Sequence, residues 1–202
     1  YNVEHLSQDE SFDIFCDIIS GKVSPIHLAS MLTSMKVRGE SIAELTGAAL
    51  ASLKHAEKFP SPDYMFADIV GTGGDGAKSI NISTASSFVA AACGYPIAKH
   101  GNRSVSSLSG SSDVLTELGV NIYATPEKSR ALLDELGVCF LFAQQYHQGF
   151  KNVAPIRAEL KTRTIFNVLG PLINPARPKI SIVGVYNESL VRPMAEVLKN
   201  LG

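Results

Sequence analysis

The stretch FADIVGTGGDG, residues 66–76, decides the fold class of this chain. Its first five residues form a short, mostly apolar run that is typical of a buried strand, and four of the remaining six residues are glycines. Glycines let the backbone turn sharply and bring several N–H groups close to an anion. The spacing fits neither a Walker A loop nor a dinucleotide-binding fingerprint. We predict a strand followed by an anion-binding loop, although a glycine-rich loop alone is equally compatible with a simple turn.

Downstream of this stretch, short apolar runs alternate with amphipathic segments. We predict strands at 66–70, 96–98, 122–124, 138–143 and 180–185. We predict helices at 83–93, 111–118, 127–136, 153–160 and 188–201. This alternation indicates right-handed crossovers and a mostly parallel sheet. Ligands of such sheets bind at the carboxyl ends of the strands, so the loops after Val70, Ala98 and Ala143 are candidate sites.

The segment before this stretch is predicted to be helical. Ser7 or Asp9 can cap a first helix, a Ser-Pro pair at 24–25 opens a second, and the capping box SIAE at 41–44 opens a third. Each start is followed by apolar residues at helical spacing.

The segment PSP at 60–62 is a stiff connector and a plausible domain edge. We therefore expect an α/β protein with a small helical domain, residues 1–62, before a larger α/β domain, residues 63–202. The segment of about 150–178 is expected to pack back on the helical domain.

The bulk composition excludes several classes of protein. Of 202 residues, 45% are hydrophobic and 18% are charged, which is typical of a globular chain and not of a disordered one. A net charge of −1 predicts no attraction to nucleic acid or to a membrane surface. Cys16, Cys93 and Cys139 lie far apart among apolar neighbours, as free thiols of a reducing compartment do. No secretion leader or membrane span is recognisable, so a cytoplasmic location is expected.

Two further segments carry anion-binding chemistry. The tetrapeptide NIST, 81–84, stands at the start of a predicted helix, where N–H groups and hydroxyls favour phosphate. Simple capping by Ser83 or Thr84 is the alternative, and it does not exclude an anion. The loop KHGNRSVSS, 99–107, concentrates positive charge and serine hydroxyls directly after a predicted strand. A flexible surface loop is the alternative interpretation there.

Five segments together resemble the anthranilate phosphoribosyltransferase family, which belongs to the nucleoside phosphorylase-like phosphoribosyltransferases. They are GTGGD at 71–75, NIST at 81–84, KHGNRSVSS at 99–107, SGSSDVLTELG at 109–119 and TRTIFNVLGPLINPARP at 162–178. The resemblance covers essentially the whole chain. It implies transfer of the phosphoribosyl group of phosphoribosyl pyrophosphate (PRPP) to the amino group of anthranilate. The products are N-(5-phosphoribosyl)anthranilate and pyrophosphate, in the second step of tryptophan biosynthesis from chorismate.

The resemblance also implies site residues. PRPP would be bound by Gly71, Gly74, Asp75, Ser79, Asn81, Ile82, Ser83, Thr84, Lys99, His100, Gly101, Asn102, Arg103, Ser104, Val105, Ser106, Ser107 and Ser111. Anthranilate would contact Gly71, Asn102 and Arg157, and Ser83 would be a ligand of Mg²⁺. No residue is assigned as a catalytic acid or base, because an arylamine is already neutral at neutral pH. The family is homodimeric through its helical domain, which makes a second copy an expected partner.

The resemblance further implies that the protein continues past residue 202. The chain begins at Tyr1 rather than Met and ends at Gly202 directly after a helical pattern, so we expect a fragment. Two Mg²⁺ ions per site are expected in the family, and the Asp-Glu pair for the second lies beyond residue 202. The remaining strands of the sheet are expected there too.

Two side chains have alternative interpretations. Arg157 can grip a carboxylate with its guanidinium fork, but it can also be a solvated arginine on a helix. His147 follows a predicted strand, and we favour a place in an aromatic pocket over a role as a base. His5, His27 and His55 fall in the helical segment, and their spacing fits no metal site.

Two rival functions stay open from the sequence. A pyrimidine nucleoside phosphorylase shares the fold and a glycine-rich phosphate loop, although the segments at 99–107 and 167–178 favour the transferase. A non-catalytic relative that binds nucleic acid through the same basic loop is disfavoured by the net charge of −1.

Overall fold

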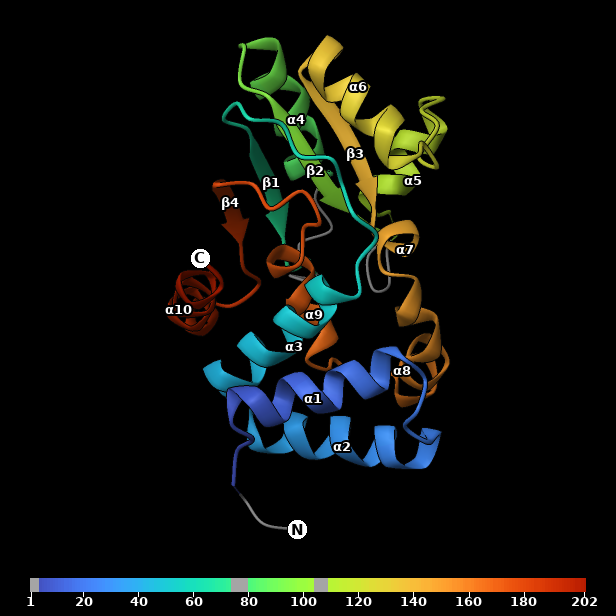
Figure 1. The fold of residues 1–202 in the computed structure, drawn as a ribbon, viewed down its shortest axis with the longest axis vertical. Helices are drawn as coiled ribbons and strands as arrows, with labels where there is room; N and C mark the ends of the chain where they lie inside the picture. The colour runs from blue at the N-terminus through green and yellow to red at the C-terminus, as the bar shows by residue number, and fades with distance from the viewer. Residues whose placement is uncertain (1–3, 74–79, 104–108) are drawn as a thin grey trace. The chain divides into compact units, whose positions relative to one another are not determined.

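The computed structural model describes residues 4–73, 80–103 and 109–202 (Figure 1). The chain forms two compact units, each assembled from separated stretches of sequence. One unit, here called the helical unit, comprises Tyr1–Ala56, His147–Ile173 and Glu188–Gly202. The other, called the sheet unit, comprises Glu57–Tyr146 and Asn174–Asn187.

The helical unit consists of helices with short connections. Its elements are α1 (Gln8–Ile19), α2 (Pro25–Arg38), α3 (Ile42–Lys54), η1 (Gln148–Asn152), α8 (Ala154–Leu160), α9 (Phe166–Leu169), η2 (Gly170–Leu172), η3 (Glu188–Leu190) and α10 (Val191–Leu201). The predicted caps are confirmed for the first three helices. Ser7 and Ser41 each form a capping box, and the hydroxyl of Ser24 accepts a bond from the His27 amide, with Pro25 at the first helical position.

The core of the helical unit forms where α3 packs against both α1 and α10. Phe15 is fully buried, and its ring centroid lies 5.6 Å from that of Phe166 on α9. Gly47 explains the close approach of α1 and α3, because a Cβ atom there would lie 2.3 Å from the carbonyl oxygen of Gln8. Small residues at this crossing therefore set the distance between the two helices.

The described residues of the sheet unit form four parallel strands in the order β3-β2-β1-β4. Its elements are β1 (Ala67–Gly71), α4 (Ile82–Ala92), β2 (Ile97–Gly101), α5 (Ser111–Glu117), α6 (Pro126–Leu136), β3 (Val138–Phe142), α7 (Ala143–Tyr146) and β4 (Ile180–Gly184). Helix α4 packs against β1 and β2, and α6 packs against β3. The predicted parallel sheet is thus confirmed.

The three strand pairs differ in length. The pair β1–β4 runs from Ala67↔Ile180 to Gly71↔Gly184, and β2–β3 from Ile97↔Val138 to Gly101↔Phe142. Between β1 and β2, whose residues are all described, the single pair is Ala67↔Ile97. The two central strands nevertheless stay adjacent along their length.

The prediction of a strand at 122–124 is wrong. The segment forms a turn, in which the side chain of Asn121 accepts a bond from the Tyr123 amide at 3.0 Å. Ile122 is buried against Leu115 and Phe142, so its apolar character reflects core packing and not strand pairing.

The predicted boundaries of several other elements also need correction. Strand β2 extends through Gly101, so Lys99 and His100 lie in the strand and not in the following loop. The predicted helix at 188–201 is divided into η3 and α10. Helix α7 has no counterpart among the predicted elements, because it begins directly where β3 ends. No helix in the described ranges combines the length and the apolar composition that crossing a membrane requires.

Candidate functional site

The candidate residues of the sheet unit gather at one edge of the sheet. Because the strands are parallel, their carboxyl ends lie at the same edge, and Gly71 and Gly101 end β1 and β2 there. The start of the glycine-rich loop is tied to the neighbouring strand. The amide of Thr72 donates to the carbonyl of Gly184 at 2.9 Å, and the hydroxyl of Thr72 accepts from the amide of Tyr186 at 3.1 Å.

Helix α4 begins at this edge. Its N-cap residue is Asn81, whose side chain makes no capping bond. Ser83 and Thr84 lie inside the first turn, so the alternative that they cap the helix is wrong. The first turn of a helix leaves several amides without helical partners, and uncapped amides favour an anion.

The side chain of Asn81 instead reaches the segment before α5. Its Nδ2 donates to the carbonyl of Ser109 at 3.3 Å, and the hydroxyl of Ser109 donates to its Oδ1 at 3.4 Å. The same segment is tied to the end of β2. The carbonyl of Asn102 accepts bonds from the Ser111 hydroxyl at 3.3 Å and from the Ser112 amide at 3.4 Å. The start of α4 and both ends of the basic loop therefore form one hydrogen-bonded group.

Gly101 is required where the basic loop leaves β2. A Cβ atom at this position would lie 2.3 Å from Ser111 Oγ and 2.6 Å from the ring of Phe140. The loop can approach α5 only because position 101 has no side chain.

Asn102 and Arg103 are exposed at the start of the basic loop. Gln144 Nε2 donates to Asn102 Oδ1 at 3.4 Å, and Arg103 Nη2 donates to the hydroxyl of Tyr123 at 3.1 Å. Sequence reasoning missed Gln144 and Tyr123 as site residues. The position of Gln144 directly after a strand was the one available signal, since the loop following Ala143 was a candidate by topology alone.

Lys99 and His100 are buried, with 4% and 3% of their surfaces exposed. The ammonium of Lys99 donates to the carbonyl of Ile69 on β1 at 2.6 Å, and the His100 amide donates to Asp68 Oδ1 at 3.4 Å. Asp68 is itself 1% exposed and accepts a bond from Asn174 Nδ2 at 2.8 Å. Sequence reasoning missed Asp68, although a carboxylate within a buried strand is rare enough to be a signal.

Burial shifts the pKa values of this buried pair in opposite directions. Burial raises the pKa of Asp68 to about 6, although Lys99, Asn174 and the His100 amide act to lower it. Burial also lowers the pKa of Lys99, and the nearby charge of Asp68 opposes that shift. Each group thus favours the charged form of the other.

Arg157, the candidate for binding a carboxylate, belongs to α8 of the helical unit. It is half-buried, its guanidinium carbon lies 5.5 Å from the centroid of the Phe166 ring, and Nη2 donates to Asn167 Oδ1 at 3.5 Å. Burial lowers the pKa of Arg157, but a guanidinium stays charged throughout the physiological range.

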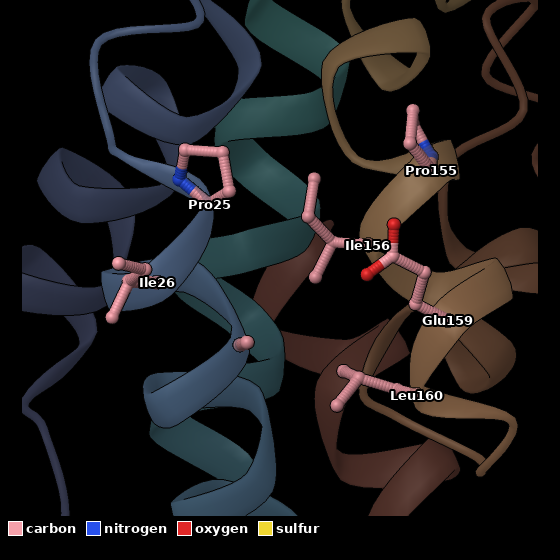
Figure 2. A pocket seen from close by; sticks show the side chains of 7 residues that line it. Pro25, Ile26, Pro155, Ile156, Glu159 and Leu160 are labelled. Carbon is pink, nitrogen blue, oxygen red and sulfur yellow. The ribbon is translucent and has the colours of Figure 1, made fainter.

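His147 does not line the hollow that lies in the helical unit. His147 is 3% exposed, its Nε2 donates to the carbonyl of Ile173 at 3.0 Å, and its ring stacks on Phe150. A hollow of about 450 Å³ lies between α2 and α8 (Figure 2). It is lined by Pro25, Ile26, Ala29, Pro155, Ile156, Glu159 and Leu160. None of the predicted site residues lines it.

Part of the predicted site lies outside the described residues. These positions are Gly74, Asp75, Ser79, Ser104, Val105, Ser106 and Ser107. Within the described ranges, no group of three or more His, Cys, Asp or Glu side chains is placed to hold a metal ion.

Comparison with known proteins identifies the family. Residues 63–202 match the α/β domain of the glycosyl transferase family, and residues 1–56 match the helical bundle domain of the same family. The chain belongs to this glycosyl transferase family.

Individual members of the glycosyl transferase family agree with this assignment. The chain is 62% identical over its full length to the anthranilate phosphoribosyltransferase of Photobacterium profundum, of which it covers 60%. The crystal structure of anthranilate phosphoribosyltransferase from Thermus thermophilus matches 99% of the chain and 61% of its own, with a TM-score of 0.94 and 43% identity. The enzyme of Saccharomyces cerevisiae, in complex with PRPP and Mg, matches 95% of the chain and 57% of its own, with a TM-score of 0.87 and 31% identity.

The match covers the whole of this chain but only part of each curated relative. The chain spans about 60% of the length of the curated relatives it matches. Nothing among these relatives favours the nucleoside phosphorylase alternative.

Proposed function

We propose that this chain is the PRPP-binding part of an anthranilate phosphoribosyltransferase. The complete enzyme transfers the phosphoribosyl group of PRPP to the amino group of anthranilate and releases pyrophosphate. The observation that carries the proposal is the hydrogen-bonded group at the carboxyl edge of the sheet, where Asn81 binds Ser109 and Asn102 binds Ser111. It holds the start of α4, whose N-cap side chain makes no capping bond, beside the start of a basic loop, as a phosphorylated sugar requires.

The roles of the described residues follow from their chemistry. Gly71, Asn81, Ile82, Ser83 and Thr84 offer backbone amides and short polar groups to the pyrophosphate. We propose that Asn102, Arg103 and Ser111 bind the 5-phosphate and the ribose, and their position after β2 at the same edge supports this role. Lys99 acts from inside the sheet unit, since its ammonium is buried. We extend the PRPP site to Gly74, Asp75, Ser79 and residues 104–107 by family resemblance.

Arg157 is proposed to bind the carboxylate of anthranilate, together with Asn102 and the backbone of Gly71. A guanidinium fork suits a carboxylate, and the ring of Phe166 and the amide of Asn167 limit the orientations that Arg157 can take.

The transfer itself does not require covalent catalysis by the protein. Attack of the arylamine nitrogen on C1 of PRPP forms the N–C bond as the bond to pyrophosphate breaks, with an oxocarbenium-like transition state. The amine is neutral and loses its proton after the bond forms. The protein positions the two reactants and stabilises the charge that develops on the leaving group. This division of work agrees with a site that lacks an assigned acid or base.

A Mg²⁺ ion is proposed to accompany PRPP, and Ser83 fits one of its ligand positions. The carbonyl of Ser83 accepts a bond from Ser87 Oγ at 2.7 Å, and none of the described residues binds the Ser83 hydroxyl. Mg²⁺ prefers hard oxygen ligands and often takes most of them from water and substrate phosphates. When bound, the ion neutralises charge on the pyrophosphate. A second ion is expected from the family and would need carboxylates that the described residues do not gather.

We further propose that the enzyme is a cytoplasmic homodimer that uses its helical unit for contact. The three cysteines are unpaired, which supports a reducing compartment. On α2, Ile26 and Val37 expose 80% and 83% of their surfaces, and Ile26 also lines the hollow of Figure 2. Exposed apolar side chains of this kind support contact with a second copy. Sedimentation of the wild type and of Ile26→Glu tests this part, and equal masses at all concentrations would contradict it.

The test of the proposed reaction is the loss of anthranilate fluorescence on mixing with PRPP and Mg²⁺. The 202-residue chain is compared with a version extended to the length of its relatives. A loss of anthranilate fluorescence that requires PRPP and Mg²⁺ in the extended protein supports the proposal. The same loss with the 202-residue chain would mean that residues 1–202 suffice for the reaction. Folded protein that leaves anthranilate unchanged in both cases but cleaves thymidine with phosphate would replace the transferase by a phosphorylase.

The metal ligand is tested by Ser83→Ala in the extended protein. Ser86→Ala, one turn further along α4, is the matched control. Ser83→Ala should raise the Mg²⁺ concentration needed for half-maximal rate, whereas Ser86→Ala should leave it unchanged. Identical Mg²⁺ dependence in both variants would remove Ser83 from the ligand set.

A further inference from the structure

Polar groups connect β1 and β2, which stay adjacent along their length. Beyond the pair Ala67↔Ile97, the two strands are bridged by side chains. Lys99 Nζ donates to the Ile69 carbonyl at 2.6 Å, and the His100 amide donates to Asp68 Oδ1 at 3.4 Å. Hydrogen bonds between side chains and backbone thus connect the two strands that the candidate loops follow.

Asn174 joins the same group from a distant part of the sequence. Its Nδ2 donates both to Asp68 Oδ2 at 2.8 Å and to the Ala98 carbonyl at 2.9 Å, and its Oδ1 accepts the Ala176 amide at 2.9 Å. Asn174 therefore fixes the carboxylate of Asp68 relative to the backbone of β2.

Asp68 and Lys99 are the buried Asp, Glu, Lys or Arg side chains among the described residues of the sheet unit. An isolated buried charge is strongly disfavoured, and an opposite charge nearby offsets that cost. The carboxylate of Asp68 belongs to the residue next to Ile69, whose carbonyl binds the Lys99 ammonium. The Lys99 ammonium is therefore bound one residue along β1 from Asp68, and the two buried charges stabilise each other electrostatically.

We propose that Asp68 is a positioning residue of the PRPP site: its buried carboxylate, held by Asn174 and the His100 amide, keeps the Lys99 ammonium charged at the place where the Ile69 carbonyl of β1 binds it. This inference rests on the proposed function, in which Lys99 contributes positive charge to the PRPP site. Asp68 acts through Lys99 and does not itself touch PRPP.

The other groups around the pair do not provide this charge. Cys139 on β3 stays a neutral thiol, because burial raises its pKa to about 12 and the charge of Asp68 adds to that shift. Asn174 is neutral, and His100 contacts the carboxylate through its backbone amide. A change in PRPP affinity with pH is therefore expected to come from the Asp68–Lys99 pair.

The functional test is the pH dependence of PRPP affinity, measured by calorimetry in the presence of Mg²⁺ between about pH 7 and pH 10. The charge of the PRPP phosphates changes little in this range, because the second pKa of a phosphate monoester is about 6. Removing the carboxylate in Asp68→Asn should let Lys99 lose its proton at lower pH. The pH at which affinity declines should then fall by about one to three units, as loss of a nearby opposite charge typically causes. Asp134→Asn, an exposed carboxylate of the same unit paired with Arg130, should leave the profile unchanged.

A second measurement tests the pairing without PRPP. Unfolding in urea is compared for Asp68→Asn, Lys99→Met and the double variant. If the two charges stabilise each other, each single variant leaves one buried charge without its partner. The double variant should then lose less unfolding free energy than the sum of the losses in the two single variants. Strictly additive losses overturn the pairing, as does an unshifted pH profile in a folded Asp68→Asn variant. Absence of PRPP binding by the wild type, with coupling still present in urea, would contradict the proposed function and leave the pairing standing.

Discussion

The guanidinium of Arg157 lies over the ring of Phe166, with its central carbon 5.5 Å from the ring centroid. Phe166 also contacts the rings of Phe15 and Phe150, so the ring that supports Arg157 is fixed by the core of the helical unit. Asn167, the next residue, adds a hydrogen bond to Nη2 at 3.5 Å. The segment 162–178, one of the five that carry the family resemblance, thus has a direct physical role in orienting Arg157.

Replacing Arg157 should affect the KM for anthranilate but not the KM for PRPP. In the extended protein, Arg157→Ala should raise the KM for anthranilate by about tenfold to a hundredfold, because charge-assisted bonds contribute roughly 1.5–3 kcal/mol. The KM for PRPP should stay unchanged. Arg157→Lys keeps the charge but loses the fork, so an intermediate effect is expected. Lys151→Ala, an exposed cation on η1, is the control. A larger change in the KM for PRPP than in that for anthranilate would contradict the assignment.

The sequence predicts the elements of the sheet unit well where pattern and chemistry agree. The apolar run before the glycine-rich loop forms β1, and the serine caps stand at the starts of α1, α2 and α3. Prediction fails where tertiary contacts decide. Ile122 looks like a strand residue because a buried turn and a short strand have the same apolar signal.

The support of the candidate site was less predictable than its loops. Asp68 interrupts an apolar strand, and the residue that binds its carboxylate, Asn174, stands 106 positions away. No local pattern connects the two. The sequence pattern predicts Lys99 in a loop because a charged residue rarely continues a buried strand, and only its contact with Ile69 explains why it does so here.

Gly47→Ala should destabilise the helical unit. The new Cβ atom would lie 2.3 Å from the Gln8 carbonyl and 2.7 Å from the Phe12 amide, both of them backbone atoms that cannot move independently. We expect the free energy of unfolding to fall by about 1–3 kcal/mol in urea, the usual cost of overpacking. Gly170→Ala is the control, since no atom lies within 4 Å of a Cβ built there. Equal stability of the two variants would show that α1 and α3 separate without cost.

Glu44 should stabilise the helical unit only in its charged form. It is fully buried, and its carboxylate accepts bonds from Arg38, from the Ser41 amide at 2.8 Å and from the Leu6 amide at 3.1 Å. Burial alone would raise its pKa, but these bonds and His5 hold the pKa below the ordinary value of 4.5. The stabilisation is therefore complete above about pH 4.5 and is lost as the pH falls through the lower folded-state pKa.

The variant Glu44→Gln tests this contribution. It should lower the free energy of unfolding at neutral pH by about 2–4 kcal/mol, because it leaves Arg38 without its counter-charge. Glu10→Gln makes the same change in the exposed capping box of α1 and should cost much less. Similar losses in both variants would mean that burial of Glu44 adds nothing.

His147 should make the helical unit less stable in mild acid. Burial lowers its pKa to about 4, although its bonds to Ile173 and Ser52 oppose the shift, and the ordinary value is 6.5. Between these values the unfolded chain binds a proton and the folded chain does not. The free energy of unfolding therefore falls as the pH decreases, by on the order of 3 kcal/mol across this window.

In His147→Phe the ring can still stack on Phe150, so this part of the pH dependence should disappear. The variant should cost about 1 kcal/mol at neutral pH for the lost bond to Ile173. Urea unfolding followed by helical circular dichroism from about pH 7.5 to about pH 4.5 measures both effects, with the exposed His27→Phe as the control that keeps the wild-type slope. A wild-type slope in His147→Phe as well would place the titrating group elsewhere, and His147 would then be protonated within the folded core.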